Sequence, residues 1–352
     1  MEMARAVVVH SRSTGAAEET NGRAGVYSQP SVEEEPSPAN HDRGRPSRTA
    51  KRAMGKSRKK AYSRKAITKR NLAYLQWRYV RNAGRALRAW LARPSFDDSA
   101  NIAEEMSRRG IVVGASDTYL SAPGQQALRE ASAHVLALAS QSEVQAAINA
   151  GASGDSKEYL IRLIPFGQEF APDSPLLRLA LDKKLLEIVS LYLGMWPRLH
   201  AVGAWLNFPS AHEPKDSQLW HRDPEDLKNV KVFIYLVDVD EDRGPFCYIP
   251  ETQPFGNRAS AVPKHSDKIR VTDEEMRAVI PAHAWLTCVG PANTMILADT
   301  IGYHRGGKAK NGNRILITFT YTSGKPLAKA SQAPRLKGIP AWATHAVQRH
   351  AL

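Results

Sequence analysis

Cysteine is scarce in this chain of 352 residues: only Cys247 and Cys288 occur, each inside an apolar segment. Two such thiols do not form a disulfide framework, so we expect buried free thiols and a reducing, cytoplasmic setting. The sequence also lacks any window approaching the roughly 18 apolar residues that a membrane span requires. Its first apolar run is too short for the core of a signal peptide. Together these absences argue against a disulfide-rich secreted scaffold and against a membrane-spanning protein.

Acidic residues are absent from residues 43–93, which hold 18 Lys and Arg residues. Residues 1–93 hold 21 basic against 7 acidic residues, whereas residues 94–352 hold 28 of each. The formal net charge of +14 therefore belongs to the N-terminal part, and only this part predicts an anionic partner. Residues 1–60 are rich in Ser, Pro, Glu, Arg and Lys with few apolar anchors, a composition that predicts a disordered arm.

Apolar residues recur at helical spacing in the following segment, and they predict a basic amphipathic helix over residues 61–93, ended by Pro94. The stripe consists of Leu72, Leu75, Tyr79, Ala83, Leu87 and Trp90. Two interpretations explain this stripe. The basic segment 43–93 contacts nucleic acid, an acidic membrane surface or an acidic protein, or the apolar stripe packs on the rest of the chain.

The pattern of apolar and polar residues over residues 94–330 is typical of a globular domain. Helical periodicity predicts helices over residues 124–141 and 174–194. Short β-branched and aromatic runs separated by turn residues then predict strands at residues 158–165, 200–208, 229–239, 245–250, 284–289, 293–299 and 314–322. This order predicts a mainly β protein with flanking helices (α+β), in the form of an antiparallel barrel or double-sheet jelly roll with helices outside. Residues 331–352 form a C-terminal tail.

A histidine and an aspartate stand two residues apart, His221 and Asp223, just before a β-branched run in "WHRDPEDLKNVKVFIYL". In extended backbone both side chains point to the same face, so they can bind one metal ion. His304 follows a second strand-like run and supplies a third candidate ligand. Two histidines and one carboxylate leave three coordination positions open, which suits non-haem Fe(II). A structural zinc site would instead use a fourth protein ligand, usually sulfur.

Arg314 stands ten residues after His304 and opens the next predicted strand. A guanidinium binds a carboxylate through two parallel hydrogen bonds at fixed geometry. At this place it can hold the remote carboxylate of a dicarboxylate oxo acid that chelates the metal.

In this order and spacing, "WHRDPEDLKNVKVFIYLVDVDEDRGPFCYIPET" and "LADTIGYHRGGKAKNGNRILITFTYTS" resemble the phytanoyl-CoA dioxygenase-like family of Fe(II)/2-oxoglutarate oxygenases, over about residues 155–325. The resemblance implies a double-stranded β-helix, His221, Asp223 and His304 as iron ligands, and Arg314 bound to the 5-carboxylate of 2-oxoglutarate. It also implies O2 as cosubstrate, and hydroxylation of a small organic molecule with release of succinate and CO2.

The same resemblance implies roles for two further residues. Asn207 matches a polar position that touches 2-oxoglutarate, and Phe233 matches an aromatic wall position. Alternatively, Asn207 ends a strand and Phe233 belongs to the core. Gln253 departs from the family pattern because it stands where relatives have a histidine that is not an iron ligand.

Two other classes remain open. One is a catalytically silent β-barrel binding protein targeted by its basic N-terminal arm, and the other is a cupin that holds zinc or manganese without oxygenase activity. The identity of the substrate does not follow from the sequence. Four basic residues near the motif, Arg222, Lys228, Lys231 and Arg243, are interpreted as solvated.

Overall fold

The computed structural model describes residues 73, 76–92, 94–150, 159–223, 225–261, 270–326 and 332–352. The chain divides into the units Met1–Arg58 and Lys59–Leu352, and every described residue belongs to the second. The prediction of a disordered arm over residues 1–60 therefore lies outside the described residues.

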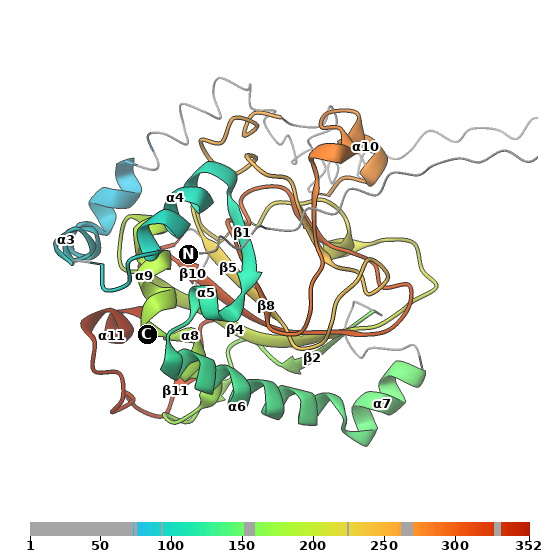
Figure 1. Ribbon diagram of the computed structural model, residues 1–352, viewed down its shortest axis with the longest axis horizontal. Helices are drawn as coiled ribbons and strands as arrows, with labels where there is room; N and C mark the ends of the chain where they lie inside the picture. Colours follow the sequence, from blue (N-terminus) through green and yellow to red (C-terminus); the bar gives the residue numbers. More distant parts are fainter. Residues whose placement is uncertain are drawn as a thin grey trace, which may run out of the picture. The chain divides into compact units, whose positions relative to one another are not determined.

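Antiparallel pairing joins six strands into one sheet, in the order β1-β8-β5-β10-β4-β2 (Figure 1). Their bounds are Ile111–Ala115 (β1), Leu160–Ile164 (β2), Arg198–Asn207 (β4), Val230–Tyr235 (β5), Thr294–Ala298 (β8) and Arg314–Thr322 (β10). A second antiparallel sheet has the order β7-β6-β9 and consists of Leu286–Cys288 (β7), Phe246–Tyr248 (β6) and His304–Gly306 (β9). A short parallel pair joins β3 (Glu169–Phe170) to β11 (Arg335–Leu336).

The two faces of the six-stranded sheet bury different sets of side chains. Successive side chains of a strand point to opposite faces of its sheet. Along β5, Val230, Val232 and Ile234 share one face, and they belong to the large core that the helices cover. Tyr235 on the other face joins Phe246 and other residues of the small sheet in a second cluster, against which Phe233 also packs. The two sheets therefore face each other, and the helices cover the outer face of the larger one.

The helices lie before and among the strands. Their bounds are Ala83–Leu91 (α3), Ser99–Arg109 (α4), Ser116–Tyr119 (α5), Ala122–Ala139 (α6), Ser142–Asn149 (α7), Pro175–Ala180 (α8), Lys183–Leu193 (α9), Asp273–Arg277 (α10) and Ala346–Ala351 (α11). Helix α6 contacts β2 and β10, and α11 contacts α9 and β4. Antiparallel sheets with flanking helices confirm the predicted α+β class at this level.

The helix predicted over residues 174–194 is wrong as a single helix, because it is two. Helix α8 ends at Ala180, and α9 begins at Lys183 after Asp182. The Asp182 carboxylate accepts a hydrogen bond from the Leu185 backbone N–H at 3.1 Å, so it caps α9. It also accepts the Ser121 N–H at 3.2 Å, and this contact fixes the chain just before α6.

Helical residues 76–81 and α3 lie in the segment predicted to form the basic helix; its part over residues 61–72 lies outside the described residues. This helical segment is held to the domain by polar side chains. The buried Arg78 donates to the buried Asp226 at 3.4 Å and to the Leu193 carbonyl oxygen at 3.3 Å. Asn82 accepts from the Lys325 N–H at 3.2 Å, and Arg85 donates to the Pro197 carbonyl at 2.7 Å.

Within the described residues, no helix combines the length and the apolar composition needed to cross a bilayer.

Candidate metal and anion site

Backbone pairing brings the three predicted metal ligands together. His221 and His304 exchange backbone hydrogen bonds, with N···O distances of 3.0 and 3.1 Å, as an isolated antiparallel bridge. The Asp223 N–H donates to the Thr300 carbonyl oxygen at 2.9 Å, which holds the loop after His221 beside the end of β8. One possible ligand atom from each of His221, Asp223 and His304 then lies within 4.8 Å of the others.

Both imidazole rings present Nε2 toward the Asp223 carboxylate. The His221 Nε2 lies 3.7 Å from Oδ1, and the His304 Nε2 lies 3.4 Å from Oδ2. Each Nδ1 instead faces a backbone carbonyl oxygen, of Leu219 at 2.8 Å and of Gly302 at 3.0 Å. Because a carbonyl oxygen only accepts, each neutral ring carries its proton on Nδ1 and keeps the Nε2 lone pair for a metal.

The electrostatics keep these groups in their ligating forms. Burial, and then the nearby His304, lower the pKa of His221 to about 3, so this ring is neutral at physiological pH. Burial alone would raise the pKa of Asp223, but the adjacent Lys231 ammonium and His304 outweigh it, so the pKa lies well below its usual value. The site thus offers the neutral imidazole of His221, the imidazole of His304 and a carboxylate, a donor set that fits a divalent transition metal.

Lys231 contradicts its interpretation as a solvated residue. It lies on β5 with its side chain largely buried, and its ammonium pairs with the Asp223 Oδ2 and, at 3.6 Å, with the Glu225 Oε1. Burial would lower the pKa of Lys231, but these two carboxylates raise it above its usual value. The sequence offers a signal for this in hindsight: Lys231 shares a strand face with Phe233 and Tyr235, so it points between the sheets.

Arg314 is a buried cation without an acidic partner among the described residues. Arg314 is 4% exposed, and neither its Nε nor its Nη1 has a hydrogen-bond partner among the described residues. Burial lowers the pKa of this guanidinium, yet an arginine side chain stays charged in proteins. A charge that is buried, ionised and unpaired is costly, so the arrangement fits a site whose anion comes from outside the chain.

The position of Arg314 relative to the histidines follows from a glycine. A Cβ on Gly306 would lie 3.2 Å from the Arg314 Nη2, so the guanidinium sits close against this residue. Gly306 is two residues after His304 on β9, on the same strand face. Same-face neighbours on a strand are roughly 7 Å apart, so the unpaired guanidinium lies about one such step from His304.

The two remaining predicted site residues line the same space. Asn207 ends β4 directly opposite Arg314 in the register and is 9% exposed. The Phe233 ring lies 4.4 Å from that of Phe246, which in turn lies 5.7 Å from that of His304. Phe233 is therefore part of an aromatic row that reaches a candidate ligand, and it also packs against the cluster between the sheets.

Gln253 makes its described side-chain hydrogen bonds at the end of α4. It is buried, and its Nε2 donates to the carbonyl oxygens of Ser107 and Arg108 at 3.1 and 3.2 Å. The Gln253 side chain thus binds the C-terminal end of α4.

Searches of known proteins give limited likenesses. No protein-family model matches the chain, and no curated protein matches it. Among solved structures it is similar to EctD from S. alaskensis in its apo form, with 20% sequence identity, 71% of this chain and 88% of that chain covered, and a TM-score of 0.45. It is similar to SnoN, a non-heme α-ketoglutarate-dependent epimerase from nogalamycin biosynthesis, with 16% identity, 64% and 81% covered, and a TM-score of 0.41. HygX from Streptomyces hygroscopicus, solved with nickel, 2-oxoglutarate and hygromycin B bound, gives 16% identity, 63% and 86% covered, and a TM-score of 0.39.

Proposed function

We propose that this chain is an Fe(II)- and 2-oxoglutarate-dependent dioxygenase of the phytanoyl-CoA dioxygenase-like kind, built on a double-stranded β-helix, and that it hydroxylates a small organic molecule. The observation that carries the proposal is the buried guanidinium of Arg314, which lacks an acidic partner among the described residues and lies beside the strand of His304. A metal-binding triad alone is compatible with many proteins. A triad with an unpaired cation at this spacing fits a ligand that has one chelating end and one anionic end.

The distance between the metal-binding triad and the Arg314 guanidinium supports a short dicarboxylate as the ligand. One same-face step along β9 separates His304 from Gly306, against which the guanidinium lies, and this step is roughly 7 Å. A five-carbon oxo diacid is long enough to bridge a metal held at His304 and a guanidinium at that distance. Arg314 would hold its far carboxylate through two parallel hydrogen bonds, donated by Nη2 together with Nε or Nη1, the two nitrogens that have no partner in the described chain.

The donor set favours iron over structural zinc. His221, Asp223 and His304 supply two nitrogens and one carboxylate, and no cysteine belongs to this group in the described part of the chain. The thiols of Cys247 and Cys288 are buried elsewhere, in the strands β6 and β7. Three protein ligands leave room for a chelating cosubstrate and for O2.

The protein's own residues prepare this site in distinct ways. The Leu219 and Gly302 carbonyls fix the tautomer of the two histidines. The Lys231 ammonium holds the Asp223 carboxylate, and Glu225 helps to balance the charge of Lys231. With Fe(II), 2-oxoglutarate and O2 bound, such a site oxidises a C–H bond of the substrate and releases succinate and CO2. Phe233 and Phe246 give the space beside His304 an aromatic wall that limits water and positions an organic substrate.

The test is an anaerobic titration of the metal-free protein with Fe(II) and then 2-oxoglutarate, followed by absorption. Chelation of Fe(II) by the oxo acid gives a visible metal-to-ligand charge-transfer band. We expect this band in the wild type, its loss in His304→Ala, and a band only at much higher 2-oxoglutarate concentration in Arg314→Met. Tightly held zinc and no band would favour the cupin alternative and refute the dioxygenase.

A further inference from the structure

The helical segment 76–91 turns its apolar side outward. Its large apolar residues are strongly exposed: Trp77 55%, Val80 64%, Leu87 55%, Trp90 80% and Leu91 63%. We call these five residues the apolar stripe. No residue of α3 is buried, so the interpretation in which the apolar side packs on the domain is wrong for Leu87 and Trp90.

The side of the segment that meets the domain is polar instead. Arg78, Asn82 and Arg85 recur at helical spacing and make the contacts to the domain described above. An ordinary amphipathic surface helix buries its apolar face and exposes its charges. Here the polar face is satisfied inside the protein, and the apolar stripe has no protein to cover it among the described residues.

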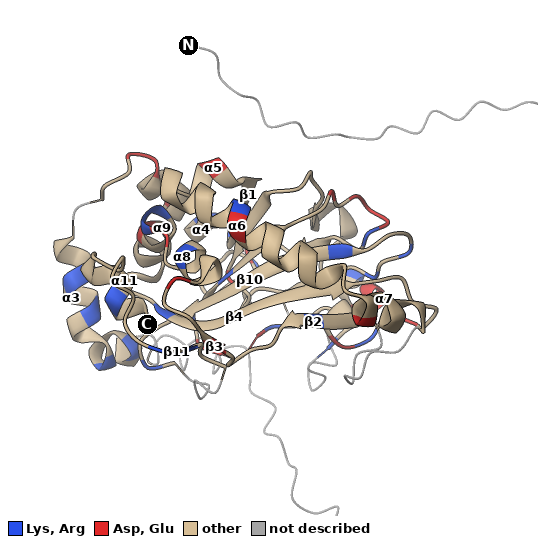
Figure 2. Cartoon of the chain, turned by 90° about the horizontal axis from the view of Figure 1, so that it is seen from below, with Lys and Arg blue, Asp and Glu red and all other residues tan. Residues whose placement is uncertain are grey.

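Positive charge borders the stripe. Arg81 and Arg88 are exposed on the same segment, and α3 shows basic but no acidic positions (Figure 2). The surrounding sequence continues this bias, with 18 basic and no acidic residues over residues 43–93. The partner of the stripe should therefore be apolar at its centre and anionic around it.

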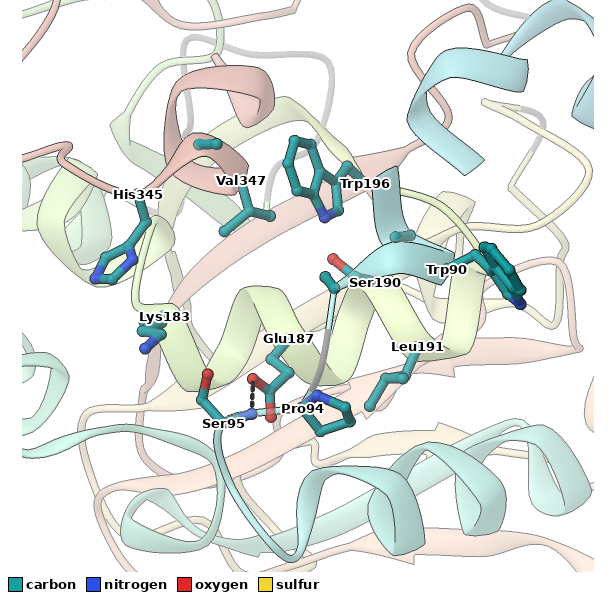
Figure 3. Close-up of a pocket in the computed structure, with 14 residues that line it drawn as sticks. Trp90, Pro94, Ser95, Lys183, Glu187, Ser190, Leu191, Trp196, His345 and Val347 are labelled. Carbon is teal, nitrogen blue, oxygen red and sulfur yellow. Dashed lines mark hydrogen bonds between the residues drawn. The ribbon is translucent and has the colours of Figure 1, made fainter. Parts of the chain in front are cut away.

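Apolar surface continues from α3 onto the neighbouring helices. A hollow of about 400 Å³ lies between α3, α9 and α11, and Trp90, Leu191, Trp196 and Val347 are among its lining residues (Figure 3). The lining carboxylate, Glu187, is already bound by the Ser95 and Phe96 N–H groups at 2.6 and 3.0 Å. The lining also includes the basic Lys183, which offsets this negative charge toward an anionic partner.

We infer that residues 76–91, two consecutive helical stretches joined at Asn82, form an interfacial segment that docks the protein onto an anionic lipid bilayer, with the apolar stripe inserted at the acyl boundary and Arg81 and Arg88 at the headgroups. Aliphatic side chains such as Val80, Leu87 and Leu91 fit hydrocarbon better than a phosphate backbone, which disfavours nucleic acid. Tryptophan is favoured at the boundary between hydrocarbon and water, where Trp77 and Trp90 would lie near the two ends of the segment. A long basic segment without acidic residues also fits an extended anionic surface.

The experiment is flotation of the full-length protein with vesicles of phosphatidylcholine, alone or mixed with phosphatidylserine. We expect binding to the mixed vesicles that weakens as salt rises. The stripe variant Leu87→Ser/Leu91→Ser should bind about 30-fold more weakly, because each leucine loses part of its burial in hydrocarbon. Arg81→Gln/Arg88→Gln should lose about 5-fold per arginine.

The matched control is Phe255→Ser/Ile339→Ser, which removes two exposed apolar side chains far along the chain from the stripe. It should bind vesicles as the wild type does, and thermal unfolding should show that all variants remain folded. Equal binding by the stripe variant and the wild type would overturn the inference. So would a concentration-dependent dimer, seen by sedimentation, that the stripe variant abolishes while no protein floats, because the stripe would then bind a second copy of the chain.

Discussion

Replacing Arg314 by methionine should weaken 2-oxoglutarate binding and at the same time stabilise the metal-free protein. Arg314 is 4% exposed, and its guanidinium lacks an acidic partner among the described residues. Two hydrogen bonds from a charged group contribute about 3–6 kcal/mol to holding a carboxylate, so Arg314→Met should raise the Kd for 2-oxoglutarate about 10²- to 10⁴-fold. Arg314→Lys keeps the charge but loses the planar fork, so its Kd for 2-oxoglutarate should lie between those of the wild type and of Arg314→Met.

The stability effect has the opposite sign. Without a carboxylate to bind, the buried cation costs the folded state about 1–3 kcal/mol, and methionine fills much of the same space without that cost. For a domain of this size, removal of this cost should raise Tm by about 3–8 °C.

The affinity is measured by the anaerobic absorption titration, and Tm by calorimetry of the metal-free protein without 2-oxoglutarate. Arg129→Met, which removes an exposed arginine of α6, should change neither quantity. A Tm for Arg314→Met several degrees below that of the wild type would refute the reasoning, since it would show that the guanidinium supports the fold. An unchanged Kd would refute the anion-binding role.

Three further predictions concern single residues. His304→Ala should abolish Fe(II) binding, measured by equilibrium dialysis, while the protein stays folded; retained stoichiometric iron would contradict the ligand assignment. Lys231→Met should weaken Fe(II) binding about 10- to 100-fold, since it frees the carboxylate of Asp223 to move; an unchanged Fe(II) Kd would show that Lys231 has no positioning role. Burial raises the pKa of Asp299 to about 6, so its folded form holds the proton more tightly than its unfolded form, and its contribution to stability is lost as pH rises through 6. Asp299→Asn should therefore gain more Tm relative to the wild type at pH 8 than at pH 5, and a constant difference between the two pH values would contradict this.

Local sequence patterns predicted most of the strands, because short runs of β-branched and aromatic residues bounded by turn residues favour strands locally. The run that became β5, for example, was expected over residues 229–239 and forms Val230–Tyr235. The break between α8 and α9 was missed because it depends on Asp182, whose carboxylate binds the distant Ser121. A contact between residues this far apart in sequence leaves no trace in the helical periodicity.

The candidate site likewise combines features that the local sequence predicts with features that depend on contacts between distant residues. The spacing of His221 and Asp223 is local, so the sequence could suggest a shared metal, and the structure does bring His304 beside them. The environment of Lys231 and Arg314 is not local. Both are ordinary basic residues in the sequence, and only the packing of two sheets shows that one is paired within the site and the other is unpaired in the described chain.

The pairing of Arg78 with Asp226 determines where the chain can be shortened. Asp226 is buried three residues after the candidate ligand Asp223, and its carboxylate also accepts the N–H groups of Leu227 and Ser323. A chain cut immediately before Pro94 would lose Arg78 and leave this carboxylate without its cation, at a cost of about 3–5 kcal/mol. The destabilised segment would be the one that positions Asp223. A chain that starts before residue 73 keeps both this pair and the apolar stripe, so removal of the basic sequence ahead of it measures how much that sequence adds to surface binding while the segment that positions Asp223 stays intact.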